Sequence, residues 1–354
     1  MLLDPGILNT RHVGMEANPI LIRSFGGNFM SYKKSAWRGS LIASVLLLLA
    51  GFSGSVFAQA TRTWVSGVGD DANPCSRTAP CKTWAGAISK TAAGGIINCI
   101  DPGGFGAVTI TKSITISCKH VEGSALASST NGVVINGADI DVILRGLDID
   151  GSPLTSPGLN GVRFLQGASL IVEDCVIRDF NGATPNGNGI IVNNTSLVAK
   201  VHIVNSNITG NGAGTGGAGI QIVPSGTGGA KVTVTNSVFS DNTVAVRADS
   251  AATSGAIDVT VADTTAGGAS YHGFVALGAG GPVRMMLNRV VSTNNLGEGV
   301  RSVGAGAVIR IGSSTVTGNG TGLFASGGGL LQSYGNNQVN GNTVDGTPTS
   351  VALR

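Results

Sequence analysis

Short segments that alternate apolar and polar residues recur along the chain, as in VHIVNSNITGN (201–211) and VTVTNSVFSDN (232–242). Apolar residues lie two before and three after a shared polar position. Alternation with a period of two indicates β-strands, and the polar residue between two such strands marks a bend. We predict that the apolar columns face a common interior. The polar position is held by Asp174, Asn205, Asn236, Asp263, Asn288, Ser313 and Asn336.

The interval between these polar positions shortens from 31 to 23 residues along the chain, which is the period of a solenoid. A second strand follows each pair, as in VAVRA (244–248) and GVRSV (299–303). Each repeat is therefore predicted to be one turn of short strands with Gly and Asn corners. Stacking the turns about 4.8 Å apart pairs the backbone groups and buries the apolar columns. We expect roughly ten turns.

Asparagine recurs at two positions of the repeat. Asparagine tolerates left-handed backbone, and identical amides one turn apart can hydrogen-bond to each other. We predict a structural ladder at the bend, formed by Asn205, Asn236, Asn288 and Asn336. A second set follows six residues later, at Asn211, Asn242, Asn294, Asn319 and Asn342. Both sets are assigned an architectural role.

Residues 59–95 depart from the repeat. The segment TWAGAISK (83–90) has helical spacing, and two glycines at 94–95 stop it. A short helix here would cover the open end of the first turn, since an exposed edge invites aggregation. We predict a cap over 59–95 and a β-helix over 96–354.

Residues 1–58 have the pattern of a leader. Basic residues precede the apolar run LIASVLLLLAGF (41–52), and small residues precede Gln59. We interpret residues 30–58 as a signal peptide and residues 1–29 as an extension upstream of the true start at Met30. The run is too short for a membrane span. The mature chain is therefore expected to be secreted or periplasmic, with no membrane span after signal cleavage.

Charge supplies little attraction to anionic partners. The net charge of the chain is +3, but five of its 22 basic and two of its 19 acidic residues precede Gln59, which leaves 17 of each. A neutral chain has no overall pull on nucleic acid or anionic membranes. Nucleic acid is therefore not an expected partner.

All five cysteines follow the leader. In an oxidising compartment their spacing favours two disulfides, Cys75 with Cys81 and Cys99 with Cys118. Cys175 lies in the apolar phrase VEDCVI and is predicted to be a buried thiol. No two cysteines have the spacing of a metal-binding C-x-x-C pair.

The opening of the mature part resembles the pectate-lyase-like superfamily of right-handed parallel β-helix proteins. The resemblance rests on WVS (64–66), GD (69–70), NP (73–74), Pro80 and Thr83. It implies an all-β, right-handed parallel β-helix with a short N-terminal capping helix, over essentially all of the mature chain. It implies no single activity, because the superfamily includes lyases, hydrolases, epimerases and non-catalytic surface proteins.

Enzymes of such a family, the resemblance implies, act on polysaccharides with carboxylates from adjacent turns. We predict that Asp150 and Glu173 share one outward column, where they would shift a pKa or hold Ca²⁺ if the protein is a lyase. Otherwise no cofactor is expected. The candidate catalytic residues are Asp148, Asp150, Glu173 and His202. The candidate substrate-binding residues are Arg145 and Arg178, whose guanidinium groups suit an acidic sugar.

Three functions remain open. The favoured one is a non-catalytic module that contacts polysaccharide or cell-surface glycan, because lyase and polygalacturonase signatures are not evident. His272 is interpreted as a loop residue, and Arg247 with Asp249 as a surface ion pair. The first alternative is a lyase or glycoside hydrolase acting on an acidic polysaccharide. The second is a structural or adhesive rod that self-associates through its C-terminal edge, since the tail VDGTPTSVALR (344–354) has no capping helix.

Overall fold

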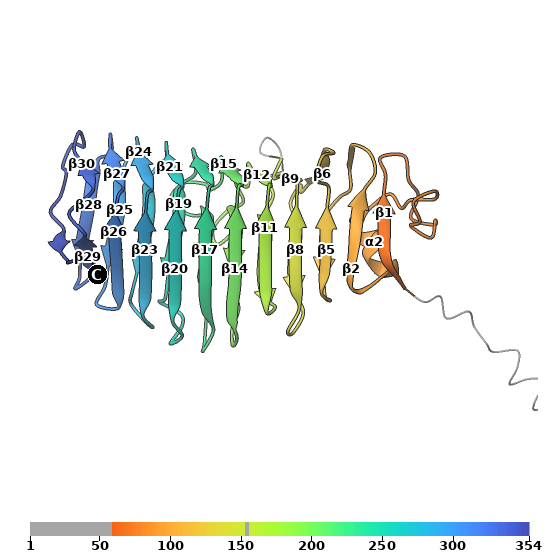
Figure 1. Cartoon of the computed structure of the whole chain (residues 1–354), viewed down its shortest axis with the longest axis horizontal. Coiled ribbons are helices and arrows are strands. Elements are labelled where there is room, and N and C mark those ends of the chain that lie inside the picture. The colour runs from red at the N-terminus through yellow and green to blue at the C-terminus, as the bar shows by residue number, and fades with distance from the viewer. Residues whose placement is uncertain (1–58, 153–155, 354) are drawn as a thin grey trace, which may run out of the picture. The chain divides into compact units, whose positions relative to one another are not determined.

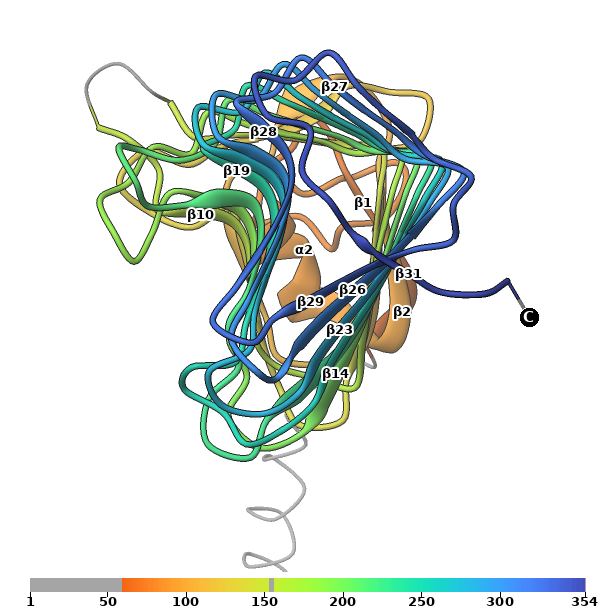
Figure 2. The same cartoon turned by 90° about the vertical axis from the view of Figure 1, so that its left-hand side faces the viewer.

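The computed structural model describes residues 59–152 and 156–353; the predicted leader lies outside them. The described chain forms three parallel sheets, here called A, B and C, that run side by side along the stack of turns (Figures 1 and 2). Each turn passes from A to B to C, and the next turn pairs with it, as β17 does with β14. This is the predicted right-handed parallel β-helix of about ten turns, with almost no helix.

Sheet A has twelve strands in the order given. They are β1 (Ala60–Val65), β2 (Thr91–Cys99), β5 (Ile114–Ser117), β8 (Asp141–Arg145), β11 (Ser169–Glu173), β14 (Val198–Val204), β17 (Gly229–Thr235), β20 (Ile257–Ala262), β23 (Val283–Asn288), β26 (Ala307–Gly312), β29 (Leu330–Ser333) and β31 (Thr349–Ser350).

Sheet B has ten short strands. They are β3 (Gly103–Gly104), β6 (Gly123–Leu126), β9 (Leu147–Asp150), β12 (Val176–Arg178), β15 (Asn207–Thr209), β18 (Val238–Ser240), β21 (Thr265–Gly267), β24 (Val291–Thr293), β27 (Thr315–Thr317) and β30 (Gln338–Val339).

Sheet C has nine strands. In chain order they are β4 (Val108–Ile110), β7 (Val133–Asn136), β10 (Asn160–Gln166), β13 (Asn188–Val192), β16 (Ala218–Ile222), β19 (Val244–Asp249), β22 (His272–Leu277), β25 (Glu298–Val303) and β28 (Thr321–Ser326).

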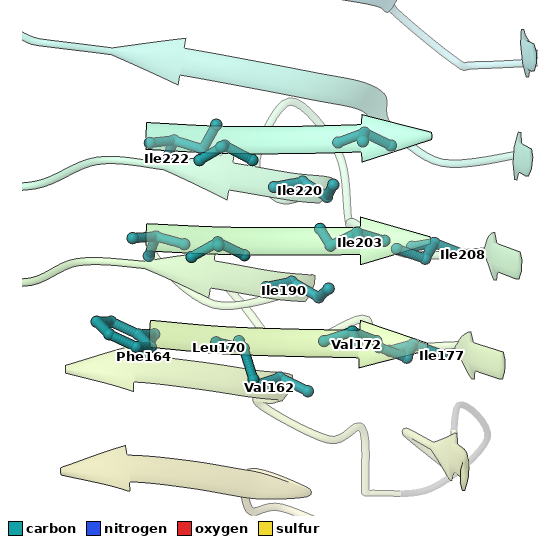
Figure 3. Close-up of a cluster of buried hydrophobic side chains, with 14 of the residues drawn as sticks. Val162, Phe164, Leu170, Val172, Ile177, Ile190, Ile203, Ile208, Ile220 and Ile222 are labelled. Atoms are coloured by element: carbon teal, nitrogen blue, oxygen red, sulfur yellow. The ribbon is translucent and has the colours of Figure 1, made fainter. Parts of the chain in front are cut away.

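The core is built from columns of aliphatic side chains that point inward from all three sheets. Figure 3 shows one part of it, where Val172 and Ile203 stack from sheet A and Ile177 and Ile208 from sheet B. All four side chains are fully buried. Burying one such side chain contributes roughly 1.5–3 kcal/mol, so the repeat stabilises itself turn by turn.

The cap combines a helix, a strand and a disulfide. Helix α2 (Trp84–Lys90) begins at Thr83, whose hydroxyl accepts the N–H of Gly86 at 2.9 Å. Trp84 is fully buried against Phe105, with ring centroids 5.8 Å apart. Strand β1 pairs with β2, so the segment before residue 96 also supplies the first strands of sheet A.

Two disulfides lie at the N-terminal end of the solenoid. One joins Cys75 to Cys81 within the cap, and the other joins Cys99 to Cys118 across the first turn. The remaining cysteine, Cys175, is buried, and this burial raises the pKa of its thiol to about 12. Its thiol is therefore protonated and unreactive in the native protein.

One bend differs from the predicted alignment by one residue. Asn288 pairs with Ala262, and the left-handed bend residue is Arg289, with φ 51°. The inward residue is therefore the buried Leu287, while Met286 lies on the outside. Two consecutive methionines obscure the alternation at this point in the sequence.

The last repeat is also shifted. Gly335, with φ 78°, takes the bend in place of the predicted Asn336. Ser333 pairs with Ile311, so Tyr334 lies on the outer side, against the prediction that it points inward. Asn336 instead accepts the N–H of Ser313 at 2.9 Å.

The amide ladder predicted at the bends does not form, whereas the second predicted set does form one. Asn205 and Asn236 do adopt the left-handed bend, with φ 52° and 50°, but both side chains are exposed. The second set forms hydrogen-bonded amide ladders between sheets B and C, with Asn295 in place of the predicted Asn294. Asn211 donates to Asn242 at 2.9 Å, Asn295 donates to Asn319 at 2.7 Å, and Asn319 donates to Asn342 at 2.8 Å. A buried amide must find a protein partner, whereas an exposed one is solvated by water.

The C-terminal tail folds back over part of the last turn. Strand β31 pairs with β29, and the carbonyl of Val344 accepts the N–H of Gly322 at 2.7 Å. The edge that was predicted to be open is therefore partly covered. In the described part of the chain, no helix is long and apolar enough to span a membrane.

Candidate functional site

The predicted acidic residues fall into two separate ion-pair groups. On sheet B, Asp148 and Asp150 lie on β9 beside Arg178 of β12. Nη2 of Arg178 is 3.0 Å from Oδ2 of each aspartate. Next to them, burial and the charge of Asp150 raise the pKa of Asp179.

The second group lies on sheet A. Nε of Arg145 on β8 donates to Oε2 of Glu173 on β11 at 2.5 Å. Lys119 adds a contact of 3.6 Å to Oε1 of Glu173 and one of 3.1 Å to Oδ2 of Asp174. These contacts, led by the hydrogen bonds of Asn205 and Lys119, lower the pKa of Asp174.

The prediction that Asp150 and Glu173 share a column is wrong. Glu173 pairs with Arg145 and Val204 on sheet A, whereas Asp150 pairs with Leu126 and Arg178 on sheet B. The bend at Asp174 separates the two sheets.

His202 is placed apart from the aspartates as well. It lies on sheet A, in register with Ile171 of β11 and Thr233 of β17, and its side chain is exposed. The four predicted catalytic residues therefore do not converge on one site.

The predicted Ca²⁺ pair does not fit the ion either. Each carboxylate already faces a guanidinium group, and the two lie on different sheets. Within residues 59–152 and 156–353, no three His, Cys, Asp or Glu side chains gather as metal ligands.

A row of arginines runs along the outer face of sheet C. The strand register aligns the outward residues of successive turns as Arg163, Ile191, Gln221, Arg247, Val275, Arg301 and Phe324. Their neighbours along each strand, such as Val246 and Ala248, are buried in the core. We call Arg163, Arg247 and Arg301 the arginine row.

The guanidinium donors of the arginine row have hydrogen-bond partners only in part. Nε of Arg163 and Nε of Arg247 are buried and have no hydrogen-bond partner among the described residues. Burial lowers the pKa of Arg247, against the opposing charge of Asp249. Arg301 donates to Oε1 of Glu298 at 2.7 Å, and its guanidinium carbon lies 5.1 Å from the centre of the Phe324 ring. Buried donors without partners are costly, so they favour an anionic ligand that accepts from them.

A histidine and a glutamate meet beside this row. Nδ1 of His272 lies 2.5 Å from Oε2 of Glu298 and accepts the main-chain N–H of Glu298 at 3.2 Å. Burial lowers the pKa of His272; the charge of Glu298 opposes this, and those of Arg301 and Arg247 add to it. The ring of Tyr271 stands edge-on to His272, 5.8 Å away.

These residues were missed by the sequence interpretation, which treated His272 as a loop residue and Arg247 as part of a surface ion pair. A signal was present. Each arginine of the row directly follows a valine in the sequence, in GVRF (161–164), AVRA (245–248) and GVRS (299–302). The shared Val-Arg phrase places the valine in the core and the arginine outside.

The chain matches no family model and no curated protein. Two solved structures are similar to it. A crystal structure of pectate lyase Pel9A superposes with a TM-score of 0.54 at 14% identity, over 82% of this chain and 77% of that one. A rhamnogalacturonan lyase gives a TM-score of 0.45 at 15% identity, over 82% and 89%. The likeness to Pel9A shows the pectate-lyase-like parallel β-helix fold.

Proposed function

We propose that this chain, a parallel β-helix of the pectate-lyase-like fold, binds an acidic polysaccharide along the outer face of sheet C. The observation that carries the proposal is the arginine row, in which Nε of Arg163 and of Arg247 lacks a partner in the described chain. A carboxylate on the ligand would accept from these donors and neutralise the charge that burial penalises.

The geometry of the row favours a linear polymer over a single small anion. Its arginines lie on different turns of one column, so they follow the stack of turns. Phe324 in the same column and the exposed Tyr271 beside it offer apolar faces to sugar rings. Pel9A, which shares the fold, is a pectate lyase. We therefore favour a glycan with repeated carboxylates.

We place this binding outside the cytoplasm. Two disulfides support an oxidising compartment, and the leader-like sequence of residues 1–58 agrees with it.

The test is binding of the purified protein to acidic and neutral polysaccharides, measured by calorimetry, for wild type and the Arg247→Met and Arg301→Met variants. Loss of one charge-assisted hydrogen bond costs about 1.5–3 kcal/mol, so we expect affinity for acidic glycans to fall by about tenfold or more. Arg178→Met removes the same charge from sheet B and serves as the control. Equal loss in Arg178→Met, or none in the sheet C variants, would contradict the proposal.

A second candidate function rests on the contact between His272 and Glu298. In a β-elimination, a base removes the proton beside a sugar carboxylate, the C–O bond to the next sugar breaks, a C=C bond forms, and the released oxygen takes up a proton. The His272–Glu298 pair can exchange one proton, and Arg301 and Arg247 can neutralise the carboxylate. We propose this activity as the alternative to binding alone.

The appearance of new polysaccharide chain ends distinguishes β-elimination from binding alone. Acidic polysaccharide is incubated with the protein, and unsaturated ends are followed by their ultraviolet absorbance. Elimination predicts their appearance with wild type and their loss in both Glu298→Gln and His272→Gln. Binding without new ends would leave the non-catalytic function in place.

A further inference from the structure

A recess lies where sheet C passes into sheet A. It is a cleft of about 270 Å³ at the ends of β7, β10 and β13. We call it the amide cleft; its lining includes Asn136, Leu165, Gln166, Asn193, Asn194 and Leu197. Only two residues link β10 to β11, whereas residues 137–140 and 193–197 make longer links in the turns on either side. The short link between two longer ones leaves the notch.

The cleft presents acceptors without counter-charges. Nδ2 of Asn194 donates to the carbonyl of Gly229 at 3.0 Å and to that of Leu197, which fixes the orientation of the amide. Oδ1 of Asn194 and Oδ1 of Asn193 are both buried, and neither has a hydrogen-bond partner in the described chain. A buried acceptor of this kind is unfavourable until a donor reaches it.

The rest of the lining selects against ions. Among the described residues that line the cleft, none is charged; they are amides, hydroxyls, a glycine and two leucines. Leu197 is 41% exposed at the rim. Leucine surface beside amide groups suits a ligand with an apolar C–H face and several hydroxyl donors, which is the chemistry of a neutral sugar ring.

We propose that the amide cleft binds one neutral sugar unit, through hydroxyl groups that donate to Asn193 and Asn194. Leu165 lies two residues beyond Arg163 in β10, at an irregularity in the pairing of β10 with β7. One glycan chain can therefore place a neutral unit in the cleft and a carboxylate on the arginine row. This linkage to a mixed polymer rests on the proposed function; the binding of a neutral sugar does not.

The test uses neutral gluco- and galacto-oligosaccharides, which carry no carboxylate, titrated into the full protein by calorimetry. We expect wild type to bind a member of this panel and Asn193→Ala and Gln166→Ala to bind it about tenfold or more weakly. Asn207→Ala, at an exposed asparagine of sheet B, is the control and should bind as wild type does. Thermal unfolding verifies the fold, and the exposed Gln166 keeps the test valid if Asn193→Ala is unstable.

The outcomes separate the two proposals. Binding that survives Arg247→Met but fails in Gln166→Ala assigns the neutral sugar to the cleft. Neutral sugar bound by wild type, with no acidic glycan bound, would overturn the proposed function and retain the cleft. No neutral sugar bound by wild type, or equal binding by wild type and both cleft variants, would overturn the cleft proposal.

Discussion

The outer faces of sheets B and C belong to the same turns, but their arginines differ in how far they are paired within the fold. On sheet B, Arg178 lies between two aspartates, each 3.0 Å from its Nη2. On sheet C, Nε of Arg163 and of Arg247 is buried without a partner in the described residues. The comparison teaches that donors left unsatisfied by the fold are a better guide to a candidate binding surface than net charge is.

The corners explain the difference. Sheet B follows a left-handed bend, and a buried amide ladder lies where it passes into sheet C. Sheet C ends in links of different lengths, and Figure 2 shows loops that project on the side of β10 and β19. Such loops can shield the strands beside them from water. Links of unequal length also form the amide cleft.

The largest expected effect is at the corner that both sheets share. Asn242 accepts from the N–H and Nδ2 of Asn211 at 3.1 and 2.9 Å and donates to Ile208 at 2.8 Å. Asn242→Ala leaves these groups unpaired, so we expect the free energy of unfolding in urea to fall by about 3 kcal/mol. Asn236→Gly, at an exposed bend with φ 50°, should change it little. Similar losses of stability in the two variants would show that the buried amide ladder stabilises the fold no more than the exposed bend does.

The next effect separates charge from hydrogen-bond geometry on sheet C. Arg247→Lys retains the positive charge but removes the buried Nε donor. We expect affinity for an acidic glycan to fall by about tenfold, or about 1.4 kcal/mol, with no change in Arg178→Lys. Calorimetry at two salt concentrations measures both. Full affinity in Arg247→Lys would mean that charge alone suffices.

The pH dependence of stability tests the environment of His272. Burial, aided by Arg301 and Arg247 and opposed by Glu298, lowers its pKa below the value of about 6.5 in an unfolded chain. The unfolded state then binds the proton more readily, so the free energy of unfolding falls as pH drops below about 6.5. We expect a smaller fall in His272→Gln, measured by urea unfolding at pH 7.5 and 5.0. His202→Gln is the exposed control; an equal fall in wild type and His272→Gln would contradict the assignment.

The smallest effect is expected on sheet B. Asp148→Asn removes one acid from a half-exposed ion pair, and such pairs contribute about 0–1 kcal/mol. The free energy of unfolding should therefore fall by less than about 1 kcal/mol, and less still in high salt. A loss above about 2 kcal/mol would show that the sheet B group is a structural network after all.

The fold could be predicted because its repeat is visible in the sequence. The columns of Val172, Ile203 and Val234 recur at a constant distance from a polar bend, and each lies in the core. The alternation of inward and outward residues was assigned wrongly at Met285 and Met286. Two apolar residues follow each other there, and only the strand pairing shows which one points inward.

The arginine row had a signal in the sequence, but which side chains of different turns meet could not be predicted, because that depends on the length of each turn. Asp150 and Glu173 are 23 residues apart, but the partner of Asp150 in the next turn is Arg178, 28 residues away. His272 and Glu298 are 26 residues apart and meet. An error of a few residues moves a side chain to another sheet, and local composition does not reveal it.

The register of sheet C also fixes the spacing between the arginines of the arginine row. Arg247 and Arg301 lie two strands apart, about 9.6 Å, and Arg163 lies three strands from Arg247 in the other direction, about 14.4 Å. Backbone hydrogen bonds set these intervals, so side-chain flexibility adjusts them only slightly. A polymer whose charges recur at a commensurate interval engages several arginines at once, while one that is out of step engages a single arginine and dissociates sooner.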